Sequence, residues 1–305
     1  MKYPMEERLI WFKNELTPIK EAKIMVMSPT AQFGLNVFEG IPCYWNTEEK
    51  KMYVFRLDDH YNRLLRSAAL LQIECPYTKE QMKEALVKVI SANEFDENVS
   101  IRQTLFVDDF GSWRSDGPTE MFVIPTPRKF NNSEYTQKGL RVCVSSWRRI
   151  SDNSLSPRIK CGANYINSRM GQREALRNGY DTCLFMNSAE KISEGPGSCF
   201  CMIKNGNLIT PILTDSVLES ITRDTVMKIA KDNGIKVTER SIDRTELYTA
   251  DEAFLCGSAM EITPIISIDG YNMSEENVLT NMIHDAYLDA AYHRDTQYGH
   301  WTSAL

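Results

Sequence analysis

Lys160 stands in a run of small residues, Lys160-Cys-Gly-Ala, at the end of an irregular loop. A lysine amine acts as a nucleophile or carries a proton near pH 7 when burial or neighbouring cations lower its pKa. Downstream, Glu194 lies in Ile192-Ser-Glu194-Gly-Pro-Gly-Ser198, where two glycines and a proline make a rigid turn that can aim a carboxylate. Taken alone, Lys160 reads more simply as a solvated lysine, and Glu194 fits a surface turn equally well.

Three further segments carry groups that bind anions. Ser220-Ile-Thr222 opens a helix, and the free backbone N–H groups of a helix start favour phosphate, although Ser220 is also a good N-cap. The small-residue loop Gly257-Ser258-Ala259 follows a strand and can present N–H groups to an anion. Arg56 stands at a strand end, where it can either bind a phosphate or lie at the surface.

The eight cysteines and four histidines form no metal-binding spacing. Cys199 and Cys201 are the closest pair, and in a strand both sulfurs would lie on one face. A redox or metal role for this pair stays open beside the simpler one of two buried small hydrophobes. We expect no metal site.

The composition is that of an ordinary globular protein, with 42% hydrophobic and 25% charged residues. A net charge of -6 gives no reason to expect nucleic-acid binding, and no Lys/Arg run indicates a membrane surface. The first residues lack the apolar core of a signal peptide, and no stretch reaches membrane-spanning length. We therefore expect a cytoplasmic protein with free thiols.

Strands and helices alternate around these segments. Before the polar segment 127–139, strands are expected at 23–27, 35–45, 52–55, 99–107 and 120–125, and helices over 58–71 and from Thr78 to about residue 93. Segment 127–139 predicts a linker that closes a first α+β domain, 1–126.

The remainder, 140–305, predicts a second α+β domain. Its strands are expected at 140–147, 182–186, 199–203, 208–210, 235–241, 252–256 and 262–268, and its helices over 166–178, 220–233, 244–248 and 275–295. The irregular loop 148–163 carries Lys160. Two α+β domains with a ligand site between them are the expected architecture.

The order of the motifs resembles that of the class IV pyridoxal-phosphate aminotransferases, and within them most closely that of the branched-chain amino acid aminotransferases. The matching motifs are, in order, Phe38-Glu39-Gly40, Phe55-Arg56, Lys160 with Asn164-Tyr165, Ile192-Ser-Glu194-Gly, Ile221-Thr222-Arg223-Asp224 and Gly257-Ser258-Ala259. The match runs from about Phe33 to the tail at Trp301. It implies the two-domain α+β fold of D-amino acid and branched-chain aminotransferases, PLP fold type IV, with pyridoxal 5'-phosphate (PLP) as cofactor.

The resemblance also implies a role for each cofactor residue. Lys160 would form the Schiff base with PLP and move the proton of the substrate Cα. Glu194 would bind the pyridine nitrogen and keep it protonated, so that the ring is an electron sink, and Tyr165 would lie near the phenolic oxygen. The other cofactor contacts would come from Arg56, Ser220, Ile221, Thr222, Gly257 and Ser258.

For the substrate, the resemblance makes Phe38 an aromatic wall and Arg102 the partner of the side-chain carboxylate of glutamate, the usual amino donor. The further substrate positions that it implies are Phe33, Ser100, Trp147, Ser258 and Ala259. Phe33 stands where the family usually has tyrosine, Ser100 stands where an aromatic residue is common, and Arg148-Arg149 adds positive charge after Trp147. These departures predict retained PLP chemistry with a pocket for a larger or more polar side chain than leucine.

The reaction implied first is PLP-dependent transamination between an L-amino acid, branched-chain by default, and a 2-oxo acid. A lyase resembling aminodeoxychorismate lyase or a D-amino acid aminotransferase would keep the same fold and cofactor. A non-enzymatic binding protein on this scaffold is a third interpretation, against which Lys160 and Glu194 argue. The family builds its sites at a dimer interface, so a homodimer is expected, with amino acid and 2-oxo acid as small-molecule partners.

Overall fold

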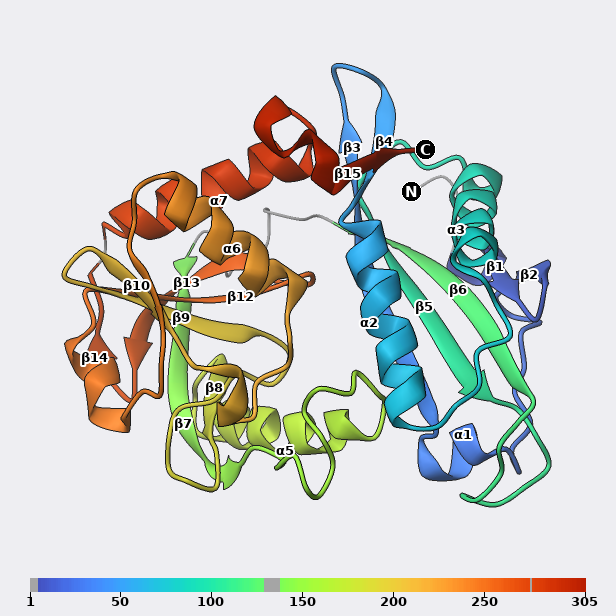
Figure 1. The fold of residues 1–305 in the computed structure, drawn as a ribbon, viewed down its shortest axis with the longest axis horizontal. Helices are drawn as coiled ribbons and strands as arrows, with labels where there is room; N and C mark the ends of the chain where they lie inside the picture. The colour runs from blue at the N-terminus through green and yellow to red at the C-terminus, as the bar shows by residue number, and fades with distance from the viewer. Residues whose placement is uncertain (1–4, 129–137, 275) are drawn as a thin grey trace. The chain divides into compact units, whose positions relative to one another are not determined.

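The computed structural model describes residues 5–128, 138–274 and 276–305, and the described chain falls into two compact units (Figure 1). Unit 1 takes the described residues of Met1–Arg128, Ile159–Ala163 and Ala290–Leu305, and unit 2 takes those of Lys129–Arg158 and Asn164–Asp289. The short segment that carries Lys160 therefore belongs by its contacts to unit 1, although it lies far along the chain.

Unit 1 is built on a seven-stranded antiparallel sheet in the order β15-β4-β3-β5-β6-β1-β2. Its strands are β1 (Leu9–Phe12), β2 (Glu15–Pro18), β3 (Asn36–Asn46), β4 (Lys51–Phe55), β5 (Val99–Val107), β6 (Thr119–Pro127) and β15 (Thr302–Ala304). The last strand thus comes from the C-terminus and pairs with β4, as the red end of the chain shows in Figure 1.

Two helices, α2 (Leu57–Leu70) and α3 (Lys79–Asn93), cover one face of this sheet. Their apolar residues and alternate residues of the strands form one buried core that includes Leu64, Leu86 and Ile41. Thr78 caps α3 in a capping box with Gln81. A short helix, α1 (Pro29–Phe33), precedes β3.

Unit 2 contains a mixed sheet in the order β11-β10-β9-β12-β13-β7-β8, with β14 paired to β13. Its strands are β7 (Leu140–Arg148), β8 (Thr182–Met186), β9 (Cys199–Lys204), β10 (Asn207–Thr210), β11 (Val237–Glu239), β12 (Glu252–Gly257), β13 (Glu261–Ile268) and β14 (Tyr271–Asn272). The β10–β11, β13–β7 and β7–β8 pairs are parallel.

The described helices of unit 2 are α5 (Asn164–Arg177), α6 (Ile221–Asp232), most of α7 (Val278–Ala291) and the 3-10 helices η2 (Leu213–Asp215) and η3 (Arg244–Thr249). Ala175 of α5 packs on Cys143, Cys183 and Phe185 of the sheet. Gly171 permits this approach, because a Cβ there would lie 2.4 Å from the Phe185 ring. The other face of the sheet forms a core with Leu247 of η3.

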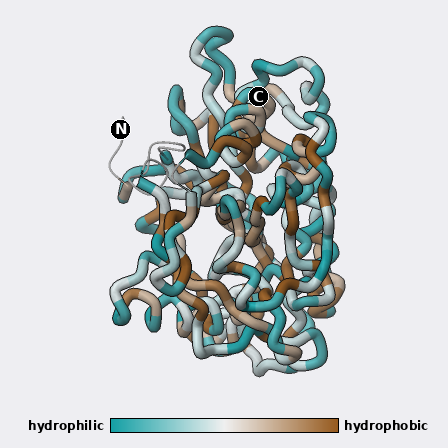
Figure 2. Tube along the Cα trace, turned by 90° about the vertical axis from the view of Figure 1, so that its left-hand side faces the viewer, coloured by the Kyte–Doolittle hydropathy of each residue, from teal (hydrophilic) through white to brown (hydrophobic). Residues whose placement is uncertain are grey.

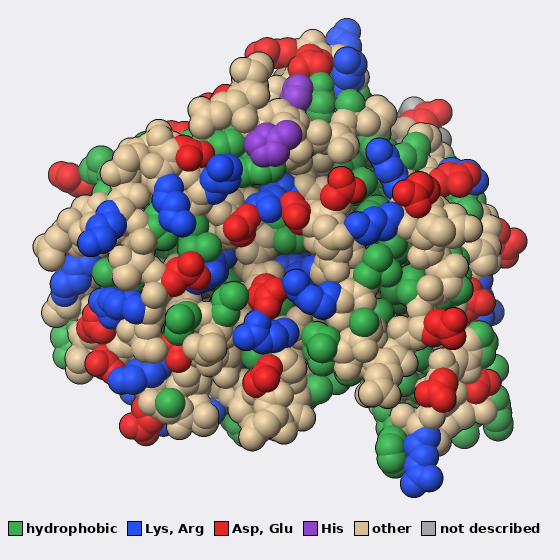
Figure 3. Space-filling model, viewed as in Figure 1, with side chains coloured by type: hydrophobic (Ala, Val, Ile, Leu, Met, Phe, Trp, Pro, Cys, Tyr) green, Lys and Arg blue, Asp and Glu red, His purple; other side chains and the backbone are tan. Residues whose placement is uncertain are grey.

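Figure 2 shows hydrophobic stretches distributed through the body of the chain and hydrophilic stretches in many of the loops at its outline. On the face shown in Figure 3, acidic and basic side chains are interspersed. Within the described part of the chain, no helix has both the length and the apolar content that crossing a membrane requires.

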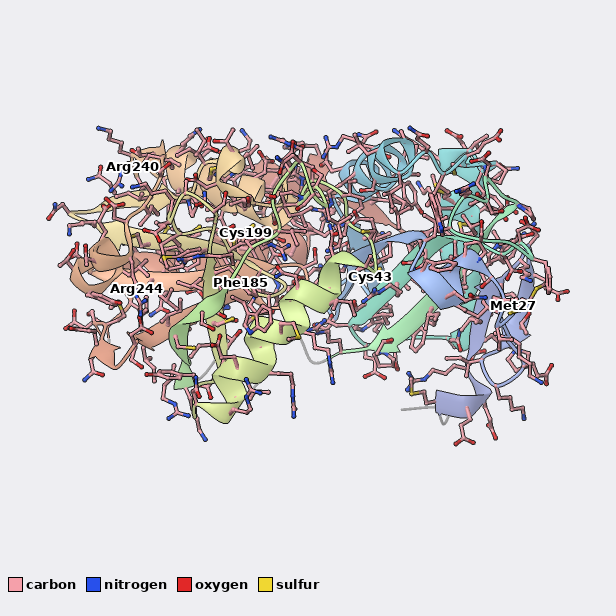
Figure 4. All side chains as sticks on the ribbon, turned by 90° about the horizontal axis from the view of Figure 1, so that it is seen from below. Met27, Cys43, Phe185, Cys199, Arg240 and Arg244 are labelled. Carbon is pink, nitrogen blue, oxygen red and sulfur yellow. The ribbon has the colours of Figure 1, made fainter. Side chains whose placement is uncertain are left out.

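Most of the predicted strands and helices are present, with ends that differ by a few residues. The strand predicted at 23–27 is wrong: Ile24 to Met27 are exposed and pair with no strand, and Met27 lies at the outer side of unit 1 in Figure 4. An apolar run forms a strand only where a neighbouring strand accepts its hydrogen bonds. Of the predicted linker 127–139, residues 129–137 lie outside the described residues, so the predicted domain boundary stays a prediction.

Candidate active site

The segment that carries Lys160 is held by backbone hydrogen bonds on two sides. The Lys160 N–H donates to Ser67 Oγ of α2 (3.2 Å), and the Phe38 N–H of β3 donates to the Lys160 carbonyl (3.0 Å). Cys161 forms a β-bridge with Val37, and both are buried. Because these contacts fix the backbone of Lys160 and Cys161, the Cα atom of Lys160 has a well-defined position.

The ring of Phe38 contacts two cationic side chains. Arg102 Cζ lies 3.9 Å and Lys160 Nζ lies 5.2 Å from the ring centroid, within the range of cation–π attraction. Gly40 opposes Arg102 and Pro42 opposes Ser100 in the β3–β5 register, so Ser100 shares this face with Phe38 and Arg102. The structure thus brings three of the predicted residues together around one aromatic ring in unit 1.

On the opposite face of β3, a buried carboxylate joins the strand to α2. Arg63 Nε and Nη2 each donate to an oxygen of Glu39 (2.7 Å), and His60 Nδ1 lies 2.7 Å from Glu39 Oε2. Burial alone would raise the pKa of Glu39, but Arg63 and His60 together lower it well below its usual range. Burial lowers the pKa of His60, and the positive charge of Lys160 is one further cause in that direction.

Arg56, a predicted phosphate ligand, is the residue directly before α2 in unit 1. Its Nε donates to Asp59 (2.7 Å) and its guanidinium lies 5.4 Å from the Trp301 ring. The phosphate-binding role of Arg56 stays a prediction.

Arg63 of α2, which pairs with Glu39, is not among the residues predicted from the sequence. It is buried and precedes Ser67 by four residues, so it lies on the same side of α2 and one turn from the Lys160 contact. The spacing of His60, Arg63 and Ser67 along the apolar stripe of α2 was the available signal, because buried charged side chains require a specific partner.

Phe33, a predicted substrate residue, is the last residue of α1 and is 47% exposed. The next residue, Gly34, adopts a left-handed conformation, and a Cβ there would lie 3.5 Å from the backbone nitrogen of Ala163. A Cβ on Gly162 would lie 2.9 Å from the side-chain oxygen of Asn36. The end of α1 and the start of β3 therefore border the Lys160 segment closely.

In unit 2, Glu194 is almost fully buried and hydrogen-bonded at both oxygens. Arg149 Nε donates to Oε1 (2.9 Å), and Arg149 Nη2 forms an ion pair with the same oxygen (2.8 Å). The Leu218 N–H (3.1 Å) and the Cys199 thiol (3.7 Å) donate to Oε2. The solvated-turn interpretation of this glutamate is therefore wrong.

The sequence-based interpretation of Arg148-Arg149 as added charge in a substrate pocket needs correction. Arg149 is buried on Glu194, and Arg148 forms an ion pair with Glu190 (3.2 Å) at an exposed position. Arg148 also lines a surface pocket of unit 2, about 490 Å³ in volume, with Glu174 and Arg244. Both guanidiniums are already paired, so they give no support for a more polar substrate.

The two predicted anion-binding segments adjoin the Glu194 turn. Ser220 is the N-cap of α6, accepting a hydrogen bond from the Arg223 N–H (3.2 Å), and it follows Leu218 by two residues. Gly257 ends β12 beside the turn, since a Cβ there would lie 3.4 Å from the Gly197 carbonyl oxygen. Ile221 and Thr222 form the buried first turn of α6, and Ser258 and Ala259 follow in the β12–β13 turn.

Each of these groups of unit 2 suits one part of a phosphorylated pyridine. A helix start and a small-residue turn suit the phosphate, and an ionised carboxylate suits a protonated ring nitrogen. Ser198, between the Glu194 turn and β9, has a buried hydroxyl oxygen that makes no hydrogen bond within the described residues. The donor set thus matches the chemistry of PLP.

Two predicted residues of unit 2 are partly exposed. Tyr165, the second residue of α5, is 37% exposed, and Trp147, near the end of β7, is 43% exposed. Glu174 of α5 accepts hydrogen bonds from Ser145 and Ser146 and so holds the strand beside Trp147. The roles predicted for these two aromatic residues stay predictions.

Among the described residues, no cluster of His, Cys, Asp and Glu could hold a metal ion. All eight cysteines are free thiols. Cys199 contacts Glu194, as given above, and Cys201 lies beside Cys256, with which it shares a hydrogen bond. Burial raises the pKa of Cys199 above its usual range, so it stays a neutral thiol.

The comparisons with known proteins agree with this geometry. The model of the amino-transferase class IV family matches residues 36–268. A probable branched-chain-amino-acid aminotransferase of Aquifex aeolicus is 36% identical and is matched over 97% of this chain and 96% of that protein. The fold matches crystal structures of two branched-chain aminotransferases, from Thermoproteus uzoniensis with norvaline (38% identity, 97% and 99% coverage, TM-score 0.93) and from Thermobaculum terrenum in its PLP form (39% identity, 99% and 99% coverage, TM-score 0.93). These matches confirm the two-domain α+β fold of PLP fold type IV, and the chain belongs to the class IV aminotransferase family.

Proposed function

We propose that this chain is a PLP-dependent branched-chain amino acid aminotransferase, which passes the amino group of an L-amino acid to a 2-oxo acid. The observation that supports this proposal most strongly is the Lys160 segment. Its backbone is fixed by β3 and α2, and its amine lies 5.2 Å from the centroid of the Phe38 ring, which Arg102 also contacts. A solvated surface lysine would need none of these constraints. Relatives with branched-chain names, matched along nearly the whole chain, support the substrate class.

The residues divide the chemistry among them. When bound, PLP supplies a conjugated ring that accepts the electrons released at the substrate Cα. Lys160 would hold the cofactor covalently and then carry the proton to and from Cα as general base and acid. Glu194 would hold the proton on the ring nitrogen, and the N–H groups of the α6 start and of the Gly257 turn would bind the phosphate.

The same pocket must take a hydrocarbon side chain and a glutamate side chain. Phe38 supplies an apolar wall, and Arg102, stacked on its ring, supplies a guanidinium that can pair with a carboxylate. The stacked position keeps Arg102 close to the site while an apolar chain is bound. This arrangement favours branched-chain substrates with glutamate as the donor.

The comparisons do not favour the alternatives with the same cofactor, a lyase or a D-amino acid aminotransferase. Chiral analysis of the amino product separates the L- from the D-specific enzyme. A homodimer is part of the proposal, since the resemblance implies a site at a dimer interface; sedimentation at twice the 35.0 kDa chain mass would support it. Eight free thiols support a cytoplasmic location.

Replacing Lys160 tests the proposal. We expect Lys160→Ala to lose the near-visible absorbance of the bound cofactor and transamination of leucine with 2-oxoglutarate, because no other amine takes its place. Lys191→Ala is the matched control: Lys191 is a partly exposed lysine of unit 2 paired with Asp243, and its loss should leave both signals unchanged. Substantial transamination by the Lys160→Ala protein would overturn the assignment.

A further inference from the structure

The carboxylate of Glu194 has a separate set of partners on each oxygen. Oε1 accepts a hydrogen bond from Arg149 Nε (2.9 Å) and forms an ion pair with Arg149 Nη2 (2.8 Å). Oε2 accepts the backbone N–H of Leu218 and lies within hydrogen-bond distance of the Cys199 thiol. Because each oxygen has its own partners, the carboxylate cannot rotate without losing these contacts.

Arg149 is itself held in place before it meets Glu194. Its Nη1 donates to Asn167 Oδ1 (3.2 Å) and lies 3.4 Å from Ser168 Oγ, both on α5. Its backbone N–H donates to the Met186 carbonyl of β8 (2.9 Å). These bonds fix the guanidinium from which the Glu194 carboxylate takes its orientation.

Cys199 is the first residue of β9 and is labelled in Figure 4 together with Phe185, whose ring lies 5.9 Å from the Arg149 guanidinium. The thiol is buried and lies 3.7 Å from Glu194 Oε2 and 3.8 Å from the Leu218 carbonyl oxygen. A thiolate next to this carboxylate would be repelled, and burial disfavours its charge. The sulfur therefore acts as a neutral, weak donor.

We propose that Arg149 and Cys199 are positioning residues that hold the Glu194 carboxylate in one orientation toward the ring nitrogen of PLP. Neither residue need touch the reacting atoms; both act through Glu194. The inference rests on the proposed function, because it assigns the target of Glu194. It also assigns a role to Cys199, which its spacing from Cys201 alone leaves open.

Nitrogen-15 NMR of the protein loaded with ring-labelled PLP, together with the dissociation constant of PLP, tests this inference. The variants are Arg149→Lys, Arg149→Gln, Cys199→Ala and Cys199→Ser. Cys201→Ala is the matched control, since Cys201 is equally buried two residues along the same strand and its hydrogen bond goes to Cys256. Glu194→Gln shows the full effect of losing the carboxylate charge.

In the wild type and the Cys201→Ala control, the ring nitrogen should show the shift of a protonated pyridine. Arg149→Gln should move this shift toward the unprotonated value and weaken PLP binding by about tenfold or more, the scale at which losing an orienting partner weakens a bound group. Arg149→Lys keeps the charge without the fork and should fall between the two. Cys199→Ala should lower the pH at which the ring nitrogen loses its proton, and Cys199→Ser, which restores a donor, should recover part of that change.

The outcomes separate the inference from the proposed function. If Glu194→Gln moves the nitrogen signal but Arg149→Lys and Cys199→Ala behave as the wild type does, the positioning role is wrong and the proposed function stands. If the wild type binds no PLP, or Glu194→Gln has no effect on the nitrogen signal, the proposed function itself fails at this residue. Should Arg149→Gln not fold, Arg149→Lys and the two Cys199 variants still decide.

Discussion

Phe38 and Glu39 are neighbours on β3 whose side chains lie on opposite faces of the unit 1 sheet. Phe38 contacts Lys160 and Arg102, and Glu39 holds the strand against α2 through Arg63 and His60. A buried ion pair is weak support for net stability, because desolvation opposes its attraction, but removing one partner leaves an uncompensated charge. One face of β3 thus contacts the predicted site residues, and the other face attaches the strand to α2.

Glu39→Gln should destabilise the protein by about 3–5 kcal/mol, because the Arg63 guanidinium would stay buried without its counter-ion. Urea unfolding at neutral pH measures this change. The matched control is Glu84→Gln, which breaks an exposed ion pair with Lys88 one turn away on α3, and its effect should be about 0.5 kcal/mol or less. Equal effects of the two variants would contradict the assignment.

The pH dependence of the same variant has a definite sign. Because Arg63 and His60 lower the pKa of Glu39 below the 4.5 of an unperturbed glutamate, its contribution to stability is complete above that pH and is lost as the pH falls toward the folded-state pKa. The stability difference between wild type and Glu39→Gln should therefore shrink as the pH is lowered below 4.5. Paired urea titrations at neutral and acidic pH check this, and a difference that grows on acidification would refute it.

At the scale of elements, the N-terminus of a helix can both stabilise the helix and bind a ligand. Thr78 and Ser220 are N-caps of α3 and α6 and make the same kind of hydrogen bond to the backbone three residues on. Only α6 begins beside the Glu194 turn, so only its free N–H groups are placed for a phosphate. The two caps therefore form a natural comparison.

Ser220→Ala and Thr78→Ala should each lower the stability of the apo-protein by about 1 kcal/mol, the usual value of a lost N-cap. Only Ser220→Ala should also weaken the binding of PLP, because its loss frays the helix start that holds the phosphate. Chemical unfolding and a fluorescence titration with PLP measure the two effects. Equal PLP affinity for both variants would remove α6 from the proposed phosphate site.

The sequence was informative where local rules decide the structure. Caps, hydrophobic periodicity and turn residues predicted α2, α3, α6 and most strands, and motif order predicted the family. It was not informative where distant contacts decide: the 23–27 run is no strand because it has no partner, and nothing local shows that the Lys160 segment joins unit 1. The buried pair of Arg63 with Glu39 was not predicted, because it joins residues that are far apart in the sequence.

At the scale of the whole molecule, predicted cofactor residues occur in both units, with Lys160 in unit 1 and Glu194 in unit 2. A ligand that binds only the folded chain stabilises it by mass action. Family membership and fold match along nearly the full length make PLP that ligand. The free energy of unfolding should therefore increase when PLP is bound, and substitution of Lys160 should reduce this increase.

Removing PLP from the wild type should lower its thermal unfolding midpoint, and adding it back at a hundred times the dissociation constant should restore about 2.7 kcal/mol of stability. Lys160→Ala should show a smaller increase, because it lacks the covalent link. Differential scanning fluorimetry with PLP, and with pyridoxal as the control that lacks the phosphate, gives the comparison. An unchanged midpoint in the wild type would contradict the cofactor assignment.

Strand β15 makes the completion of the unit 1 sheet depend on residues that are synthesised long after its other strands. The other strands of that sheet come from the first 128 residues, yet the edge beside β4 stays open until residues 302–304 emerge. Domains that fold during synthesis usually do so from the N-terminus onward, but unit 1 also waits for residues 159–163, which β3 and α2 bind. A nascent chain that stalls before residue 302 would expose β4 as an unpaired edge, which is the kind of surface that promotes aggregation.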